Sequence, residues 1–204
     1  MLFNSRMGAK RTKKVRCDNC GRGVPAYDIV GLGSMETGYR DLCTRCFNTE
    51  TAGMAGMEGF EHADFAPTEV VDCDGKAHVF HFRTRLCAPG LALDAFELRA
   101  GEPAGYQFAL IGEPEGDPMA LFARLIEKIR RALSVKHVDE GGLGLEITGQ
   151  VVRGRIDWDE VVDGRVPLLV IDGQPITWDE LGQMMMSFEG WQFKLELRDR
   201  SEEV

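Results

Sequence analysis

Alternating apolar and polar residues mark the first strands that the sequence predicts. Residues 69–73 and 76–86 flank Asp74-Gly75, and an Asp-Gly pair between two extended runs predicts a hairpin with a two-residue turn. In the second run, alternate side chains are expected to face a core and the others solvent. The expected core set is His78, Phe80, Phe82, Thr84 and Leu86, and the expected solvent set is His81, Arg83 and Arg85. Two more strands are predicted at residues 91–98 and 106–111.

A helical period predicts two helices further along the chain. Residues 118–134 follow Asp117, a suitable N-cap, and begin with Pro118, which suits the first helical position. The apolar stripe of this helix is Phe122, Leu125, Ile126, Ile129 and Leu133. Thr177 and Glu180 form a capping box that predicts the start of the second helix. Its apolar face is Leu181, Met184, Met185 and Phe188.

Strands are predicted again around the second helix. Residues 143–158 indicate one long strand, with a bulge or bend where the apolar phase changes near Gly149 and Gly154. Residues 168–171 indicate a short buried strand. Trp191, Phe193, Leu195 and Leu197 alternate with polar residues, which predicts an amphipathic last strand with a buried Trp191. Strands joined by hairpins outnumber helices, so the predicted class is α+β: a mainly antiparallel sheet domain with two helices.

Four of the six cysteines form two Cys-x-x-Cys pairs, Cys17 with Cys20 and Cys43 with Cys46. The basic N-terminus lacks the apolar stretch of a secretory signal, and no apolar run approaches the roughly 20 residues needed to span a bilayer. We therefore expect a cytoplasmic protein without membrane partners, whose thiols are reduced. Four thiolates favour one structural Zn²⁺ with no open coordination position. A redox dithiol or an iron–sulfur centre is the alternative.

The residues around these pairs carry a resemblance to a known group of zinc fingers. Gly21 permits the tight turn of a metal knuckle, residues 27–30 and 39–42 predict a hairpin, and a short helix could begin after Cys46. Over residues 17–50, this order resembles the treble-clef zinc fingers. The resemblance implies zinc but no particular function, because such fingers bind DNA, RNA, proteins or nothing.

A second resemblance covers most of the remaining chain. The stretch HVFHFR at residues 78–83, together with residues 90–108 and 167–198, is similar to a bacterial protein family of unknown function. This resemblance implies no activity and transfers no catalytic residues.

The predicted organisation has five segments. They are a basic flexible arm at 1–16, a small four-cysteine zinc finger at 17–50, a linker at 51–67, the α+β domain at 68–198 and a polar tail at 199–204. The linker, docked at Phe60 and Phe65, is expected to separate two independent cores. The domain should then survive loss of the finger.

Charge is distributed unevenly along the chain. The formal net charge is −9, and residues 51–204 hold 28 of the 33 acidic residues but only 15 of the 24 Lys and Arg residues. The basic residues near the N-terminus are candidates for contact with nucleic-acid phosphates. The candidates are Lys10, Arg11, Lys13, Lys14, Arg16 and Arg22. A solvated arm is the simpler interpretation, and the acidic remainder disfavours binding of nucleic acid over the whole surface.

Catalytic signals are weak. The sequence contains no nucleophile elbow, phosphate loop or dinucleotide glycine motif. An enzymatic site, if present, is predicted around His81, Arg83 and Arg85, acting on an anionic substrate; His78 is a further acid–base candidate. The leading hypothesis is a non-enzymatic interaction or adaptor protein that binds another protein, and the sequence leaves its oligomeric state open.

A second zinc site needs separate consideration, because Cys73, His78, His81 and Cys87 are suitable ligand types. A two-residue turn would pair Val71 with His78, which places Cys73 and His78 on one face of the hairpin. His81 and Cys87 would lie on the other face. We therefore expect one zinc ion per chain.

Overall fold

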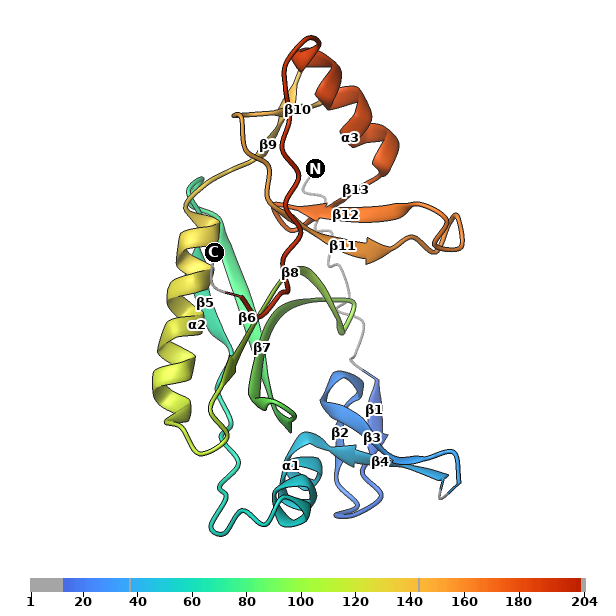
Figure 1. Ribbon diagram of the computed structural model, residues 1–204, viewed down its shortest axis with the longest axis vertical. Coiled ribbons are helices and arrows are strands. Elements are labelled where there is room, and N and C mark those ends of the chain that lie inside the picture. Colours follow the sequence, from blue (N-terminus) through green and yellow to red (C-terminus); the bar gives the residue numbers. More distant parts are fainter. Residues whose placement is uncertain (1–12, 37, 143, 203–204) are drawn as a thin grey trace, which may run out of the picture.

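A computed structural model describes residues 13–36, 38–142 and 144–202, and Figure 1 shows three parts that follow one another along its long axis. The first part contains β1 (Lys14–Arg16), β2 (Gly23–Pro25), the 3-10 turn η1 (Ala26–Asp28), β3 (Ile29–Ser34), β4 (Gly38–Cys43) and α1 (Thr44–Met54). The second contains β5 (Thr68–Val71), β6 (Ala77–Cys87), β7 (Gly90–Arg99), β8 (Glu102–Gly112) and α2 (Pro118–Leu133). The third contains β9 (Val138–Gly141), β10 (Gly144–Ile147), β11 (Gly154–Trp158), β12 (Pro167–Ile171), β13 (Gln174–Ile176), α3 (Trp178–Met185) and the 3-10 turn η2 (Met186–Phe188).

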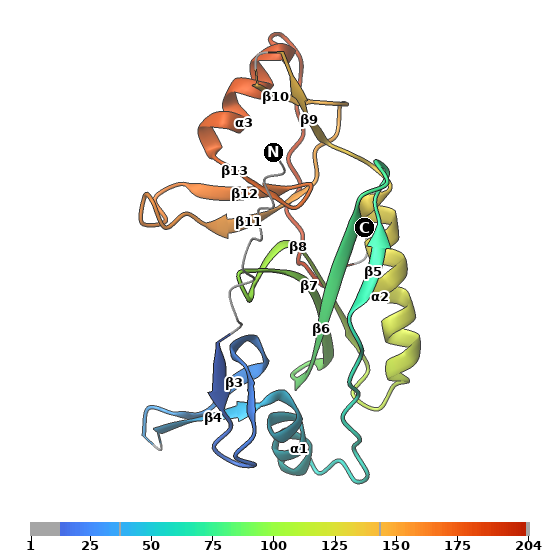
Figure 2. The ribbon, with the colours of Figure 1, turned by 180° about the vertical axis from the view of Figure 1, so that it is seen from behind.

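Every strand pair in the described residues is antiparallel, which confirms the α+β class. The second part is a four-stranded sheet in the order β5-β6-β7-β8, with α2 lying along one face (Figure 2). The predicted helix is confirmed, since α2 begins at Pro118 and the side chain of Asp117 accepts a hydrogen bond from the Met119 N–H. Its buried stripe packs on Phe80, Leu93 and Leu110 of the sheet. No helix in the described residues has both the length and the apolar character to cross a bilayer.

The β5–β6 turn is one residue longer than predicted. Val71 pairs with Ala77 and Val70 pairs with His78, so three residues rather than two connect Asp72 to Lys76. The Asp72 carboxylate accepts hydrogen bonds from the N–H groups of Asp74 and Lys76, both at 2.9 Å, and Gly75 supplies the left-handed backbone with φ +81°. An Asx turn at Asp72 therefore sets the register.

The side chains of β6 confirm one half of the predicted pattern. His78, Phe80, Thr84 and Leu86 are buried and Phe82 packs against the same core, as predicted. The opposite set, His81, Arg83 and Arg85, is half-buried rather than open to solvent. The first part covers this face, because the Tyr27 ring lies 6.1 Å from that of His81 and 5.2 Å from that of Phe96. The alternation alone carries no information about this second layer.

The third part differs most from prediction. In place of the one predicted strand, residues 144–158 form two strands, β10 and β11. The ribbon of β9 and β10 ends where the Thr148 N–H donates to the His137 carbonyl. The chain leaves the ladder around Gly149, where the apolar phase changes. The short strands β9 and β13 were not predicted. The capping box is confirmed: Thr177 Oγ1 accepts from the Glu180 N–H at 3.2 Å, and Glu180 Oε2 accepts from the Thr177 N–H at 2.7 Å.

The prediction of a packed last strand is wrong. Residues 191–198, here named the closing segment, belong to no strand, and no strand of the described residues pairs with them. Trp191 is 61% exposed, Phe193 80%, and Leu195 and Leu197 both 72%. The alternation is a real property of the sequence, but a strand forms only where another edge accepts its backbone hydrogen bonds.

Helix α1 joins the first part to the second. It continues to Met54, inside the predicted linker, and Ala52 belongs to the same core as α2. The residues that follow also dock, since Phe60 and Phe65 pack on that core and the Phe65 ring stacks on Phe122 at 4.4 Å. The two cores therefore touch, contrary to the expected separation.

Asn48 makes the most deeply buried polar contact between the first and the second part. Its side chain is fully buried, accepts from the Leu86 N–H at 2.8 Å and donates to the Thr84 carbonyl at 2.9 Å. Strand β5 pairs with β6 only as far as Phe80, so Asn48 occupies the β6 edge beyond the end of β5.

We expect Asn48→Ala to lower the free energy of unfolding by about 2–4 kcal/mol, because it leaves a buried N–H and a buried carbonyl without partners. Urea unfolding followed by circular dichroism measures the change. Thr49→Ala is the matched control, since Thr49 lies on the exposed side of the same helix and bonds only within it. A loss no larger than that of the control would show that Asn48 is not essential to the junction.

Candidate metal centre

The first cysteine pair lies on a tight turn between β1 and β2. Cys17 follows β1, its N–H donates to the Arg22 carbonyl, and its own carbonyl accepts from the Gly21 N–H, both at 2.9 Å. Gly21 takes φ +72°, which a side chain would strain. This is the knuckle that the sequence predicts.

The second pair is delivered by the β3–β4 hairpin and helix α1. Ile29 pairs with Cys43, which serves as the N-cap residue of α1, and Cys46 lies in the first turn of that helix. The Cys43 N–H donates to the sulfur of Cys17 at 3.2 Å, which ties the two pairs together. The predicted order of knuckle, hairpin and helix is therefore present.

The four thiols fit a metal ion. Their sulfur atoms lie within 4.8 Å of one another, and Cys20 Sγ is 3.9 Å from Cys43 Sγ. A tetrahedral site with zinc–sulfur bonds of about 2.3 Å requires sulfur separations of about 3.8 Å. Cys17, Cys43 and Cys46 are buried and Cys20 is exposed. The site could hold a metal ion such as zinc, and four thiolates would leave it no open coordination position.

The surroundings give each thiol a different acidity. A hydrogen bond from Arg22 Nε, 3.5 Å from the sulfur, lowers the pKa of Cys20 to about 6. Burial raises the pKa of Cys17, but backbone N–H groups outweigh burial and bring it below its ordinary value. Burial raises the pKa of Cys43, and raises that of Cys46 to about 12. A metal ion therefore has to displace protons from the buried thiols, and its affinity falls as the pH falls.

The predicted nucleic-acid residues lie beside this centre where they can be placed. Lys10 and Arg11 are outside the described residues. Lys14 and Arg16 lie on β1, and Lys13, Lys14 and Arg22 are exposed. An ideal Cβ at Gly21 would lie 3.4 Å from the Arg16 guanidinium, so that group lies over the knuckle. Four thiolates around a divalent ion carry two net negative charges, which nearby cations offset.

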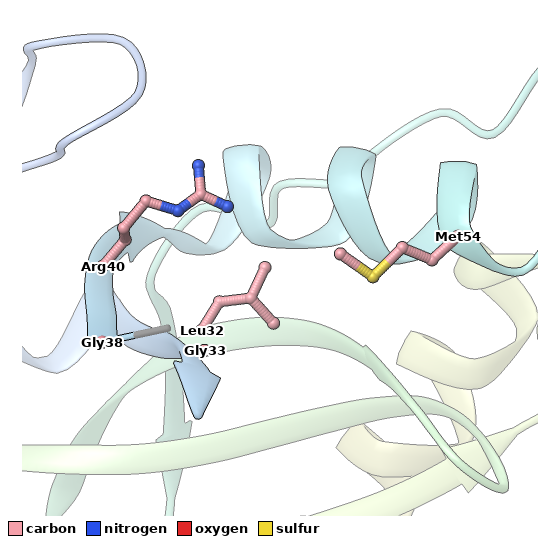
Figure 3. Close-up of a pocket in the computed structure, with 5 residues that line it drawn as sticks. All are labelled: Leu32, Gly33, Gly38, Arg40 and Met54. Carbon is pink, nitrogen blue, oxygen red and sulfur yellow. The ribbon is translucent and has the colours of Figure 1, made fainter. Parts of the chain in front are cut away.

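A groove of about 420 Å³ lies next to the helix that carries Cys46 (Figure 3). Leu32 from β3 and Met54 from the end of α1 line it with Gly33 and Gly38, and Arg40 lies at one side. Arg40 is ion-paired with Glu50 of α1. The groove is apolar and contains no residue of the predicted sites.

The residues considered for a second zinc ion do not meet. Nδ1 of His78 lies 2.9 Å from Glu97 and Nε2 lies 2.9 Å from Asp72, so carboxylates occupy both ring nitrogens. Within the described residues, Cys17, Cys20, Cys43 and Cys46 form the one group of three or more such side chains whose ligand atoms come within 4.8 Å. Cys73 and Cys87 remain free thiols outside that group.

The predicted enzymatic group has two different environments. Burial lowers the pKa of His81, whose ring lies beside those of Tyr27 and Phe96. Arg83 and Arg85 both bind the carboxylate of Asp94 through Oδ2, with Nη2 distances of 3.0 and 2.9 Å. An enzymatic role for these residues stays a prediction.

Sequence reasoning missed Asp94 itself. It is 2% exposed, and Arg200 reaches it from near the chain end, with Nη2 3.0 Å from Oδ1. Arg83 also donates to the Tyr27 carbonyl at 3.0 Å, so this cluster connects the first part, the second part and the end of the chain. A signal was present: one acid stands in an otherwise apolar strand, LALDAF, on the strand after two arginines that alternate.

Comparison with known families divides the chain at the same places as the structure. Three family models match, each described as a domain of unknown function: DUF7685 over residues 16–58, DUF7686 over 61–134 and DUF7713 over 137–202. These ranges correspond to the three parts in Figure 1. No curated protein and no solved structure matches the chain. The matches agree with the predicted resemblance to a family of unknown function, and its bacterial origin stays a prediction.

Proposed function

We propose that this protein is a non-enzymatic protein-interaction module, of the adaptor kind, built on one structural zinc ion. The observation that carries the proposal is the apolar surface of the third part. Large apolar side chains are exposed throughout it: Val151, Ile156, Trp158, Val161, Val166, Trp178, Met185, Met186, Trp191, Phe193, Leu195 and Leu197. Concentrated apolar exposure of this kind is typical of surfaces that bind other proteins.

The zinc ion in this proposal has a structural role. The cluster around the thiols contains Leu42 as its buried aliphatic side chain, with Val24, Leu32 and Phe47 partly buried beside it. So small a core needs a metal ion to stay folded. Cys17, Cys20, Cys43 and Cys46 would hold the ion and orient α1 against the sheet.

Elemental analysis is expected to give about one zinc per chain, because the proposal has one closed four-thiolate site. Replacing Cys17 and Cys20 together by Ser should reduce the content to near zero, whereas Cys73→Ser, which changes an exposed thiol outside the cluster, should leave it unchanged. Two zinc ions per chain, with one retained in the double variant, would contradict a single site.

Capture from a native lysate tests the interaction function. The zinc-loaded full chain is immobilised, and bound material is compared with and without nuclease treatment. We expect protein capture that survives nuclease and is lost in the variant Phe193→Asp/Leu195→Asp. Met119→Asp is the matched control, because it changes an exposed apolar side chain of the second part. Equal capture by the wild type and the closing-segment variant would contradict the proposal.

Nucleic-acid binding is the second candidate, favoured by the exposed Lys13, Lys14 and Arg22 around the knuckle. It predicts an affinity that falls steeply with salt. Deleting residues 1–16 would remove β1, which pairs with β2 to hold the knuckle, so substitution is the cleaner test. Replacing Lys10, Arg11, Lys13 and Lys14 by Gln should reduce both affinity and salt dependence. Unchanged binding would exclude the arm as a contact.

A further inference from the structure

The closing segment has the side-chain pattern of a strand but no partner strand. Trp191, Phe193, Leu195 and Leu197 alternate with Gln192, Lys194, Glu196 and Arg198, and all eight side chains are exposed. Within the described residues, no backbone hydrogen bond joins residues 192–198 to another segment. Like the edge of a sheet, such a segment leaves its backbone N–H and C=O groups available for pairing with another chain.

Both ends of the closing segment are held by their own chain. At the start, the Trp191 ring contacts that of Phe188, with 5.4 Å between the ring centres. The backbone N–H of Trp191 donates to the Phe188 carbonyl at 2.9 Å. At the end, Arg200 binds Asp94, and Lys128 Nζ of α2 donates to the Arg200 carbonyl at 2.9 Å. Figure 1 shows the segment stretched between these two anchors. Fixed ends reduce the conformational entropy that a partner strand must overcome.

The sequence of the segment is complementary to itself. If two copies pair antiparallel about Leu195, Phe193 of each lies opposite Leu197 of the other, and Leu195 lies opposite its own copy. On the other face, Lys194 lies opposite Glu196 and Gln192 opposite Arg198. Apolar pairs and opposite charges in directly opposed positions both stabilise antiparallel strands.

Neighbouring registers lack this complementarity. Centring the pair on Lys194 or on Glu196 would place two like charges directly opposite each other. A parallel arrangement in register would also align like charges. Shifting one copy by a single residue relative to the other would place apolar residues opposite polar ones. Among the registers centred on Lys194, Leu195 or Glu196, the one about Leu195 therefore pairs apolar residues on one face and opposite charges on the other.

We propose that two copies of this chain form a dimer by pairing their closing segments antiparallel about a two-fold axis at Leu195. The proposal rests on the proposed protein-interaction function and names the partner at that surface: a second copy. Such an interface is isologous, as in most homodimers. Because a lone two-stranded ribbon is marginal in water, further apolar surface has to join it. Ile156 and Trp158, exposed on the edge strand β11 of the same part, supply such surface.

Charge reversal with rescue tests the register. Within one chain Glu196 contacts both Lys194 and Arg198, but these ion pairs are exposed and add little. Lys194→Glu should weaken the dimer about 10-fold or more, because both symmetry-related pairs become repulsive. Glu196→Lys should do the same. The double variant Lys194→Glu/Glu196→Lys restores both pairs and should return to within about 3-fold of the wild type.

Analytical ultracentrifugation of the zinc-loaded full chain measures the association. Protein concentrations of about 1–100 µM bracket the dissociation constants of small interfaces. Leu195→Asp should abolish the association, since two carboxylates would meet at the axis. All three substituted positions, Lys194, Leu195 and Glu196, are exposed, and circular dichroism with zinc content verifies that each variant is folded. The double swap also separates this pairing from one between the closing segment and β11, where the exchanged charges would meet Arg155 and Asp157 and no rescue would follow.

A wild type that stays monomeric, a dimer insensitive to Lys194→Glu, or a double variant that fails to recover would each overturn the proposal. Testing the same variants in the lysate capture distinguishes failure of the dimer from failure of the proposed interaction function. If the wild type is monomeric but capture depends on Leu195, the dimer fails and the interaction function stands. If Leu195→Asp changes neither self-association nor capture, both fail.

Discussion

Removal of zinc is expected to unfold the first part and to loosen β6 of the second. Metal binding supplies about 10–16 kcal/mol of folding free energy in isolated zinc-finger peptides at pH 7, and the core around the thiols is too small to replace it. The same loss should follow from Cys43→Ser, because Cys43 is both a proposed ligand and the N-cap residue of α1. Without the ion, α1 loses its anchor.

Removal of zinc should also affect the second part, because Asn48 of α1 accepts a hydrogen bond from Leu86 of β6 and Ala52 of α1 packs in the core of the sheet. Hydrogen exchange is the suitable measurement, since all three tryptophans, Trp158, Trp178 and Trp191, lie in the third part and would report on that part. We expect the Leu86 amide to exchange about 10-fold faster or more after chelation, as its Asn48 acceptor departs.

Cys73→Ser is the control for Cys43→Ser, because it removes an exposed thiol outside the cluster. Its exchange pattern should match that of the wild type. Unchanged protection along β6 after complete removal of zinc would show that the two cores are independent in spite of their contact.

Asp94→Asn is expected to destabilise the protein by about 3–5 kcal/mol, the usual effect of removing one partner from a buried ion pair. The Asp94 side chain is 4% exposed and is the shared partner of Arg83, Arg85 and Arg200. An amide has the same shape but no charge, and its NH₂ group would point a donor at guanidinium donors. Three cations would then face one another without compensation.

Urea unfolding followed by circular dichroism measures this loss. Asp163→Asn is a matched control, since Asp163 is exposed and its φ of +53° is one that Asn accepts. Arg200→Ala should cost less than Asp94→Asn, because the other two arginines keep their partner. A loss of stability in Asp94→Asn no larger than that in Asp163→Asn would mean that the ion pairs of Asp94 with the three arginines do not stabilise the protein.

Local chemistry determined which features the sequence could predict. The four cysteines are candidate ligands by residue type and spacing, and the structure brings their sulfur atoms together as predicted. Helix α2 follows from Asp117, Pro118 and one apolar stripe. Features that depend on distant partners were missed. The sequence marks Asp94 as a single acid in an apolar strand, but the contact of Arg200 with Asp94 and that of Arg83 with the Tyr27 carbonyl join residues far apart in the chain. The turn at Asp72 depends on a side-chain hydrogen bond that the Asp-Gly pattern conceals.

The closing segment is a second feature whose structure depends on distant partners. Its alternation predicts a strand with a buried Trp191, but residues 191–198 form no strand and Trp191 is exposed, because the pattern specifies a face without specifying what covers it. We therefore expect Trp191→Ala to change the stability of the isolated chain by about 0.5 kcal/mol or less, rather than by the several kcal/mol that a buried tryptophan would contribute.

Asn48 also covers part of the β6 backbone. By bonding to Thr84 and Leu86 it closes the stretch of β6 that β5 leaves open. Metal starvation would withdraw α1 and leave that backbone bare beside apolar side chains, which is the condition under which edge strands aggregate. Zinc supply would then govern solubility: a chain synthesised without metal would be expected to accumulate in inclusion bodies or to be removed by proteolysis.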